Sequence, residues 1–285
     1  MDRHFSYRDD KLYYHYSLDE HPDSDSFRMH THDFCEIYIF LNGTGVFKVE
    51  GSEYPLSRGD FLILRPSESH YIDICPDRPY ERIAIHFDEK MLDSLGIGAD
   101  LLSPFYERNL GKQNYYPHSC ISSELSRAVI SSLCEDSADY RPKIVSHLLL
   151  ILWEIQRVFL AGNVSADVET LGYRIAEYIN GKISESLSLD GISEYFFISK
   201  SQLCRVFKDA TGSSIKSYII VKRLANARRL IADGVSPTEA AARSGYEDYP
   251  NFYRAYKHHY GVTPKEDAQH RSRQSVGKKR QTAGK

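Results

Sequence analysis

Short runs of alternating apolar and polar residues fill the chain from about residue 26 to residue 87. Five of these runs are rich in Ile, Val, Phe and Tyr: EIYIFL, GVFKVE, FLILRP, HYIDI and ERIAIHF. Turn signals separate them at Asn42-Gly43, Glu50-Gly51 and Arg58-Gly59-Asp60. Because alternation with a period of two is typical of strands that bury one face, the pattern predicts five or six short strands in a small antiparallel barrel.

The pattern becomes helical after residue 121. Helices are predicted over residues 122–135 and 141–160, after a mostly irregular stretch from residue 88 to residue 118. The second helix contains the segment PKIVSHLLLILWEIQRVFL, which is apolar almost all round. Since such a helix must be buried on more than one side, we expect it to pack on the barrel and to provide a surface for self-association.

Beyond residue 167 the pattern stays helical. An amphipathic helix is predicted over about residues 168–183, and two short helix pairs follow it. The pairs are expected over 189–197 with 200–211 and over 237–244 with 249–260. A longer helix that starts after a serine cap at position 213 or 214 joins them.

The second helix of each pair carries the same sequence pattern, in SKSQLCRVFKDATG and again in DYPNFYRAYKHHYG. At 100° per residue, Leu203 and Phe207 fall on the face opposite Arg205 and Lys208. An apolar back and an Arg/Lys front, preceded by a short helix, form the geometry of a helix-turn-helix DNA reader. The alternative for one copy alone is a surface helix with solvated charges, and the repeat disfavours it.

The charge of the chain is unevenly distributed. The formal net charge is −3, but residues 1–167 carry −11 and residues 168–285 carry +8. This asymmetry indicates that only the second half meets a polyanion. No run has the length and flanks of a signal peptide or a membrane span, and five scattered cysteines show no CxxC pairing. We therefore expect a cytoplasmic protein with no membrane partner.

A cluster of histidine and glutamate residues falls within the predicted barrel. His30, His32 and Glu36 follow the spacing H-x-H-x3-E, and His70 lies eleven residues after Gly59. This resembles the two cupin motifs, whose two His, Glu and later His hold a metal in metal-binding cupins. The second motif departs, because Ser67-Glu68-Ser69 stands in place of the glycine expected before the histidine. We expect a small-molecule pocket with no metal or other cofactor, formed by His30, His32, Glu36, Tyr38 and His70.

The helical half resembles the AraC-type transcriptional regulator family over roughly residues 172–264. The matching positions are Ser199, Leu203, Arg205, Phe207, Lys208 and Gly212, then Tyr218, Arg223, Ala227 and Leu230, then Gly245, Tyr246, Phe252, Arg254, Lys257, Gly261, Thr263 and Pro264. The resemblance implies two helix-turn-helix units joined by a long helix, which read successive major grooves of double-stranded promoter DNA. The candidate DNA contacts are Ser201, Gln202, Arg205 and Lys208, then Tyr249, Pro250, Asn251, Tyr253 and Arg254.

The departures from the family pattern also carry expectations. Pro237, Ala240 and Ser244 stand where larger aliphatic residues are usual, which predicts a less well-packed second unit with weaker base contacts. Lys265-Glu266-Asp267 replaces the usual aromatic-Arg ending, which puts the last contact of the domain in question. Arg223 is interpreted as a structural charge that links the two units rather than a base reader.

The predicted fold is thus a two-domain α+β protein with a cupin-like barrel, trailing helices and an all-α domain. The expected boundaries are 1–161 for effector binding and dimerisation, 162–167 for a linker, 168–267 for the DNA-binding domain and 268–285 for a basic disordered tail. The expected function is regulation of transcription. The protein is expected to be an activator that responds to a small molecule such as a sugar. Its other expected partners are a second copy of itself, in a homodimer, and RNA polymerase. The alternatives are a metal-dependent cupin enzyme with an accessory DNA-binding domain and a DNA-binding protein whose barrel only dimerises.

Overall fold

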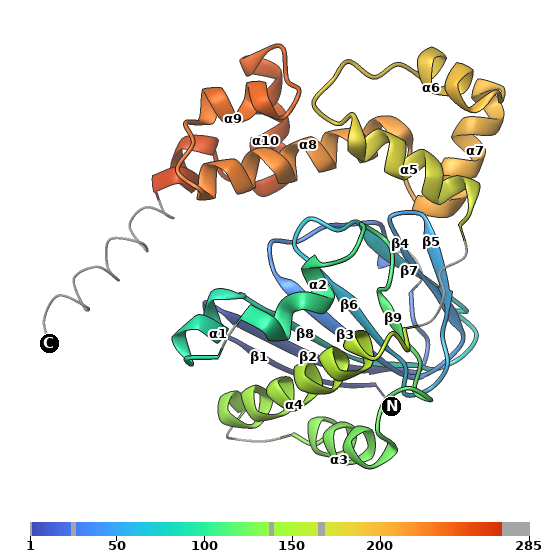
Figure 1. Ribbon diagram of the computed structural model, residues 1–285, viewed down its shortest axis with the longest axis vertical. Helices are drawn as coiled ribbons and strands as arrows, with labels where there is room; N and C mark the ends of the chain where they lie inside the picture. Colours follow the sequence, from blue (N-terminus) through green and yellow to red (C-terminus); the bar gives the residue numbers. More distant parts are fainter. Residues whose placement is uncertain (1, 24–26, 98, 137–139, 165–168, 270–285) are drawn as a thin grey trace, which may run out of the picture. The chain divides into compact units, whose positions relative to one another are not determined.

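The computed structural model describes residues 2–23, 27–97, 99–136, 140–164 and 169–269, and the chain divides near Arg174 into two compact units (Figure 1). The first unit holds antiparallel sheets and helices, and the described residues of the second unit form helices and connecting loops with no strand. The two-domain α+β prediction is therefore confirmed. Residues 165–167 of the predicted linker, residue 168 of the predicted DNA-binding domain and residues 270–285 of the predicted tail lie outside the described residues.

Two antiparallel sheets build the first unit. The six-stranded sheet has the order β1-β2-β8-β3-β6-β9, and the three-stranded sheet has the order β5-β4-β7. The strands are β1 (Arg3–Arg8), β2 (Leu12–Asp19), β3 (Cys35–Asn42), β4 (Gly45–Val49), β5 (Ser52–Pro55), β6 (Phe61–Leu64), β7 (His70–Ile74), β8 (Tyr80–Phe87) and β9 (Tyr115–Tyr116). Between β8 and β9 lie α1 (Lys90–Ser94), the 3-10 helix η2 (Ala99–Leu102) and α2 (Ser103–Tyr106).

The larger sheet uses its two faces differently, because side chains alternate along each strand. Ile37 and Ile39 of β3 and Ile83 and Ile85 of β8 belong to one core with α3 (Ser123–Leu133) and α4 (Tyr140–Leu160). Tyr38, Phe40 and Tyr80 on the alternate positions belong to a second core with residues of the smaller sheet. The pocket described below opens on this second face.

The expectation of five or six strands that begin near residue 26 is wrong at the N-terminus. β1 and β2 precede that point, and β2 pairs with β8 in the middle of the large sheet. β1 gives little apolar signal because it is an edge strand with largely exposed side chains. In β2, LYYHYSLD, tyrosine and histidine occupy positions where a strand pattern normally shows aliphatic residues.

The helices of the second unit match the predicted ranges closely. They are α5 (Leu171–Gly181), α6 (Leu189–Phe196), α7 (Lys200–Thr211), α8 (Ile215–Ala232), α9 (Pro237–Arg243) and α10 (Tyr249–Tyr260). Ser214, Ser236 and Asp248 cap helix N-termini through their side chains. Gly212 and Gly261 follow α7 and α10 with φ of 70° and 72°, the left-handed conformation that commonly ends a helix.

The small residues of α9 do not leave the second helix pair thinly packed. Ala240 and Ser244 are fully buried, and the rings of Tyr246, Phe252 and Tyr256 pack around this region. Asp267 replaces the usual ending with a different anchor, because its Oδ2 accepts hydrogen bonds from Tyr256 Oη at 2.6 Å and Arg228 Nε at 2.8 Å. The expectation of a less well-packed core is therefore wrong at these positions.

Arg223 has the structural role that the sequence suggests. From α8, its Nε donates to the Ile183 carbonyl at 2.9 Å, and an Nη donates to the Glu185 carbonyl at 2.7 Å. These bonds hold the segment after α5 against the joining helix. Gly245 lies beside them at φ 89°, where an added Cβ would come within 2.9 Å of both Arg223 Nε and the Ile183 oxygen.

One side of α4 remains open to solvent in the described chain. Leu150, Trp153 and Leu160 are 49%, 53% and 69% exposed, while the opposite side packs into the first core. None of the helices in the described ranges is sufficiently long and apolar to cross a membrane.

Candidate nucleic-acid interface and ligand pocket

The helix α7 presents a polar face above a buried one. Ser199 Oγ accepts a hydrogen bond from the Gln202 backbone N–H at 3.2 Å, which caps the first turn. Leu203 and Phe207 are completely buried, so the helix is fixed in rotation. The four candidate DNA contacts on this helix are all exposed: Ser201, Gln202, Arg205 and Lys208.

Arg205 and Lys208 have no hydrogen bond or ion pair with another side chain in the described part of the protein. Lys200, at the start of the same helix, is instead paired with Asp190 of α6. The two basic side chains are therefore available for an external anion without first breaking an internal contact. Arginine offers a fork that fits guanine O6 and N7, and lysine suits phosphate.

The helix α10 gives a second polar face with a different arrangement. Pro250, Asn251, Tyr253 and Arg254 are exposed, and an Nη of Arg254 donates to the Asn251 side-chain oxygen. Tyr249 is only partly exposed, because its ring lies 5.6 Å from that of Phe252 in the core. Four of the five candidates on α10 thus share the outer face, and Tyr249 mainly packs.

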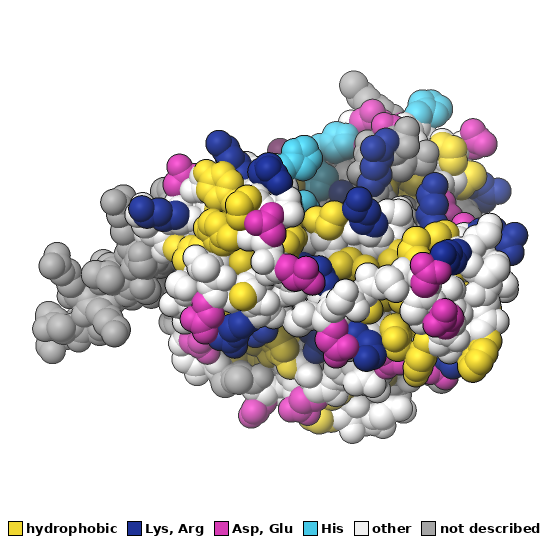
Figure 2. Space-filling view, turned by 90° about the horizontal axis from the view of Figure 1, so that it is seen from above, with side chains coloured by type: hydrophobic (Ala, Val, Ile, Leu, Met, Phe, Trp, Pro, Cys, Tyr) yellow, Lys and Arg dark blue, Asp and Glu magenta, His cyan; other side chains and the backbone are white. Residues whose placement is uncertain are grey.

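A cleft of about 760 Å³ lies within the helical unit and is lined from both helix pairs. Cys204 of α7 and Asn251 of α10 line it, and Lys216 and Ile220 of α8 contribute side chains between them. Viewed from above, basic, acidic and apolar side chains are interspersed on the visible face rather than gathered in one basic patch (Figure 2).

The ligand pocket lies between the two sheets of the first unit and has a volume of about 380 Å³. β8 supplies side chains at every second position, namely Tyr80, Arg82, Ala84 and His86. The neighbouring strand β2 supplies Tyr13, His15, Ser17 and Asp19 in the same alternation. The period of two therefore brings together polar residues that are far apart in the sequence.

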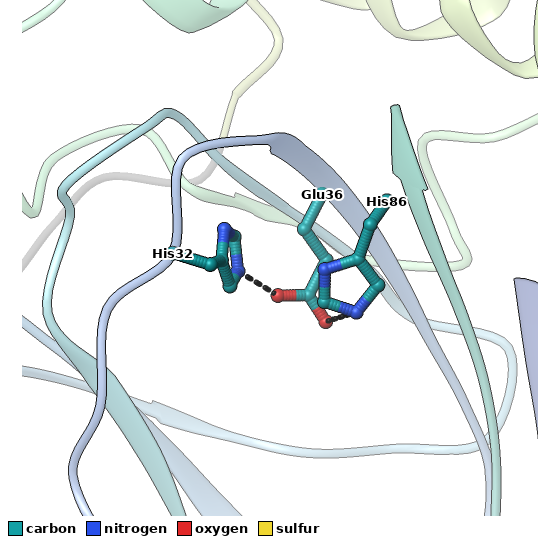
Figure 3. A group of neighbouring side chains, drawn as sticks. All are labelled: His32, Glu36 and His86. Carbon is teal, nitrogen blue, oxygen red and sulfur yellow. Dashed lines mark hydrogen bonds and ion pairs between the residues drawn. The ribbon is translucent and has the colours of Figure 1, made fainter. Parts of the chain in front are cut away.

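Three histidines surround the buried carboxylate of Glu36 at one side of this pocket. Two of them, His32 and His86, are drawn with Glu36 in Figure 3. His32 Nε2 lies 2.8 Å from Glu36 Oε2, His70 Nε2 lies 3.3 Å from the same oxygen, and His86 Nε2 lies 3.7 Å from Oε1. Burial acts to raise the pKa of Glu36, but His86, His32 and His70 together hold it well below its usual range. Burial lowers the pKa of His86 to about 4, so this ring is neutral near pH 7.

The ring nitrogens show what this cluster can hold. His32 Nδ1 lies 2.9 Å from the Phe34 carbonyl, and His70 Nδ1 lies 2.9 Å from the Glu68 carbonyl. His32 thus has an oxygen atom at both ring nitrogens, whereas His70 Nε2 lies 3.3 Å from Glu36 Oε2 without the geometry of a hydrogen bond. Although burial acts to lower the pKa of His70, its interaction with Glu36 raises it overall. His32, Glu36 and His86 are close enough together to hold a metal ion.

A second polar group in the pocket consists of two tyrosines and an arginine. The hydroxyls of Tyr38 and Tyr80 are 2.6 Å apart, and both side chains are buried. Burial acts to lower the pKa of Arg82, but Tyr80, Tyr38 and Glu36 raise it overall, so the guanidinium is charged. Its Nε is buried and has no hydrogen-bond partner among the described residues.

The structure brings most of the predicted pocket residues together and adds others. His30, Glu36, Tyr38 and His70 line the pocket, although His30 is also exposed and its ring stands 4.3 Å from that of His70. His32 is not part of the lining and lies behind it, with Nε2 2.8 Å from Glu36 Oε2. His86, Arg82 and Tyr80 were not among the sequence predictions. The run ERIAIHF places Arg82, Ala84 and His86 on one face, but only the register that sets His86 opposite Glu36 identifies that face as the pocket.

Glu68 explains the departure from the second cupin motif. Its carboxylate receives hydrogen bonds from Arg108 at 2.8 Å to each oxygen, and both side chains are completely buried. The Gly111 backbone N–H and the Asn114 amide also donate to it, at 2.8 and 3.1 Å. This position holds the segment before β9 in place, which a glycine could not do.

Both halves of the chain match known protein families. Residues 12–152 match the AraC-like ligand binding domain, and residues 192–270 match the helix-turn-helix domain. Among curated proteins, the chain is 26% identical over 248 residues to the HTH-type transcriptional activator RhaS of Yersinia pestis bv. Antiqua (strain Angola), with 85% of this chain and 89% of the relative covered. RhaS of Yersinia pseudotuberculosis serotype O:1b (strain IP 31758) shows the same identity and coverage.

Solved structures also resemble parts of the chain. The transcriptional regulator with an AraC-type DNA-binding domain from Chromobacterium violaceum is 31% identical over 34% of this chain and 88% of that chain, with a TM-score of 0.32. The C-terminal domain of AraT, a response regulator from Geobacillus stearothermophilus, is 26% identical over 35% of this chain and 85% of that chain, with a TM-score of 0.34.

Proposed function

The chain belongs to the AraC-type transcriptional regulator family, and on that premise we propose that it activates transcription when a small polar molecule, such as a sugar, occupies the barrel pocket. It is a DNA-binding transcription regulator, and its curated relatives carry the name of a transcriptional activator. The observation that supports this most is the pair of capped helices, α7 and α10, each with a buried apolar back and an exposed polar front. We also propose that the protein acts in the cytoplasm, and its DNA-binding domain supports this location.

In this proposal α7 and α10 enter successive major grooves on one side of the duplex. Arg205 reads a base, because it is exposed and unpaired in the described chain, and Lys208 contacts phosphate. Ser201 and Gln202 supplement α7, while Pro250, Asn251, Tyr253 and Arg254 form the front of α10, with Tyr249 at its edge. The internal bond between Arg254 and Asn251 must open or be shared when α10 meets a base.

Arg205→Ala tests these roles. We expect a loss of about 1–3 kcal/mol of binding free energy that is confined to one base position, since a bidentate arginine discriminates by that amount. Lys208→Ala should instead weaken all sequences about evenly and reduce the salt dependence of binding. Quantitative binding to a library of single-base variants distinguishes the two, with Arg78→Ala in the other unit as the control. A uniform loss for Arg205→Ala would exclude its role as a base reader.

We further propose that the protein acts as a homodimer and contacts RNA polymerase. The exposed side of α4, with Leu150, Trp153 and Leu160, supports the dimer, because a large apolar strip on a helix favours burial against a partner. Effector binding would act by changing how the dimer presents its four reading helices to DNA. The pocket residues His30, His32, Glu36, Tyr38 and His70 would then supply polar contacts to the effector.

A metal-dependent activity of the barrel is the second candidate, favoured by the close grouping of His32, Glu36 and His86. We expect instead that protons satisfy this cluster, because His70 already forms an ion pair with Glu36. Elemental analysis of the purified protein decides between them. Substoichiometric transition metal is expected, and stoichiometric metal that disappears in His32→Ala would favour the enzyme.

A further inference from the structure

Arg82 lies on β8, one of the two strands that each supply four side chains to the pocket. On β8 it stands opposite Ser17 of β2 and Phe40 of β3 in the ladder of the large sheet. Its side chain lines the pocket between Tyr80 and His86, and its guanidinium carbon lies 5.9 Å from the ring centre of Phe27. The large sheet therefore places a cation in the space between the two sheets.

No carboxylate in the described part of the protein forms an ion pair with this cation, although Glu36 acts on it electrostatically. Its Nε is buried without a hydrogen bond, and no ion pair involves its guanidinium. The two carboxylates that line the pocket are paired elsewhere. Glu36 is held by histidines at 2.8 and 3.3 Å, and Asp19 lies 3.4 Å from His4 Nε2.

Arg82 as a whole is half-buried, but its Nε is shut off from water without a partner. This is unfavourable for a cation, and a bound anion would relieve the cost. The planar fork of arginine fits a carboxylate with two parallel hydrogen bonds. The hydroxyls of Tyr38 and Tyr80 add one donor, because one hydroxyl donates to the other and the second proton remains free. The arrangement thus suits a carboxylate better than an uncharged group.

The rest of the lining defines the remainder of the ligand. Only Ile72 and Ala84 among the lining side chains are aliphatic, and the others are aromatic or polar. Aromatic rings and hydrogen-bonding side chains fit a ligand with several hydroxyl groups rather than a hydrocarbon chain. The volume of about 380 Å³ is near the lower end of the range of about 300–1,000 Å³ for ligand pockets, which fits a single sugar-sized molecule.

We propose that the pocket takes a polyhydroxylated carboxylic acid of monosaccharide size, a uronic or aldonic acid, with its carboxylate on Arg82 and its hydroxyls on the histidines around Glu36. This assignment rests on the proposed function, since it names the chemical class of the effector. In this assignment the guanidinium of Arg82, which has no ion-pair partner in the described part of the protein, selects the ligand.

Isothermal titration of the full-length protein with matched ligands tests the proposal. The probes are galacturonate against galactose, gluconate against glucitol, and hexanoate as a carboxylate without hydroxyls. We expect at least one acid to bind at least about tenfold more tightly than its uncharged counterpart and than hexanoate. Equal or tighter binding of the uncharged sugar, or of hexanoate, would overturn the proposal.

Variants link that preference to one side chain. Arg82→Gln should abolish the preference for the acid, and Arg82→Lys should retain part of it, because the charge remains but the fork is lost. Arg78→Gln, an exposed arginine four residues earlier, should leave both affinities unchanged. Thermal unfolding of the ligand-free Arg82→Gln protein should occur at or above the wild-type temperature, since an unpaired charge has been removed. A preference that survives in Arg82→Gln would refute the assignment.

The same titrations separate this inference from the proposed function. If only uncharged sugars bind, the acid assignment fails and the effector pocket stands. If no probe binds, both the acid assignment and the sugar-like effector fail. If acids bind as expected but the full-length protein shows no specific DNA binding, the assignment stands and the proposed regulation fails.

Discussion

Glu68→Gln removes one charge from the completely buried pair that Glu68 forms with Arg108, while it keeps the shape of the side chain. The carboxylate receives two hydrogen bonds of 2.8 Å from this guanidinium and others from Gly111 and Asn114. Loss of one partner leaves Arg108 as an uncompensated buried cation. The expected result is a large loss of stability in the first unit.

Two arguments give the size of this loss. Removal of one member of a buried ion pair commonly costs about 3–5 kcal/mol. Burial acts to raise the pKa of Glu68, but Arg108 and the backbone donors lower it from 4.5 to about 2, which corresponds to ~3 kcal/mol at about 1.4 kcal/mol for each pH unit. We therefore expect Glu68→Gln to lower the free energy of unfolding by about 3 kcal/mol at pH 7.

Urea unfolding followed by tryptophan fluorescence measures this directly, because Trp153 is the single tryptophan of the chain and lies on α4 in the first unit. Glu53→Gln is the control, since Glu53 is exposed and its pair with Lys48 should contribute at most about 1 kcal/mol. The folded pKa of Glu68 is depressed, so its contribution is complete above pH 4.5 and is lost as the pH falls toward 2. The gap between wild type and Glu68→Gln should therefore narrow at pH 3. A gap below about 0.5 kcal/mol at pH 7 would refute the reasoning.

Two further predictions concern the helices. Gly245→Ala should destabilise the second unit by more than Gly234→Ala, measured by far-ultraviolet circular dichroism, because the two glycines have φ of 89° and 90° but only Gly245 would bring a Cβ within 2.9 Å of Arg223. We expect the difference to be about 1–3 kcal/mol, and equal losses would show that backbone strain alone is responsible. Trp153→Glu should dissociate the proposed dimer in sedimentation velocity, because it puts a charge in an apolar interface. If the Trp153→Glu variant still sediments as a dimer at the concentrations where the wild type does, this side of α4 is not the interface.

The helical domain could be predicted almost residue by residue because its signals are local. A capping serine or aspartate begins five of the predicted helices, and a glycine with positive φ ends α7 and α10. The apolar face of each reading helix follows from spacing alone. The packing around Ala240 was not predictable in this way, because the rings that fill the space come from Tyr246 and α10.

The pocket could be predicted only in part, because its residues meet through strand register. The His32 and Glu36 spacing is local and was visible in the sequence. His86 and Arg82 enter the site because β8 lies between β2 and β3 in the sheet, an order that no turn signal indicates. Glu68 likewise looked like a loss from a motif, and its partner Arg108 lies 40 residues away.

Footprinting of the full-length protein on DNA upstream of neighbouring genes tests the central claim most directly. At physiological salt we expect a protected site whose two contact regions are one helical turn apart for each chain, about 34 Å, with binding at least about a thousandfold tighter than to random DNA. The Arg205→Ala substitution should reduce protection within one of those regions. Binding to all sequences with equal affinity would contradict the account.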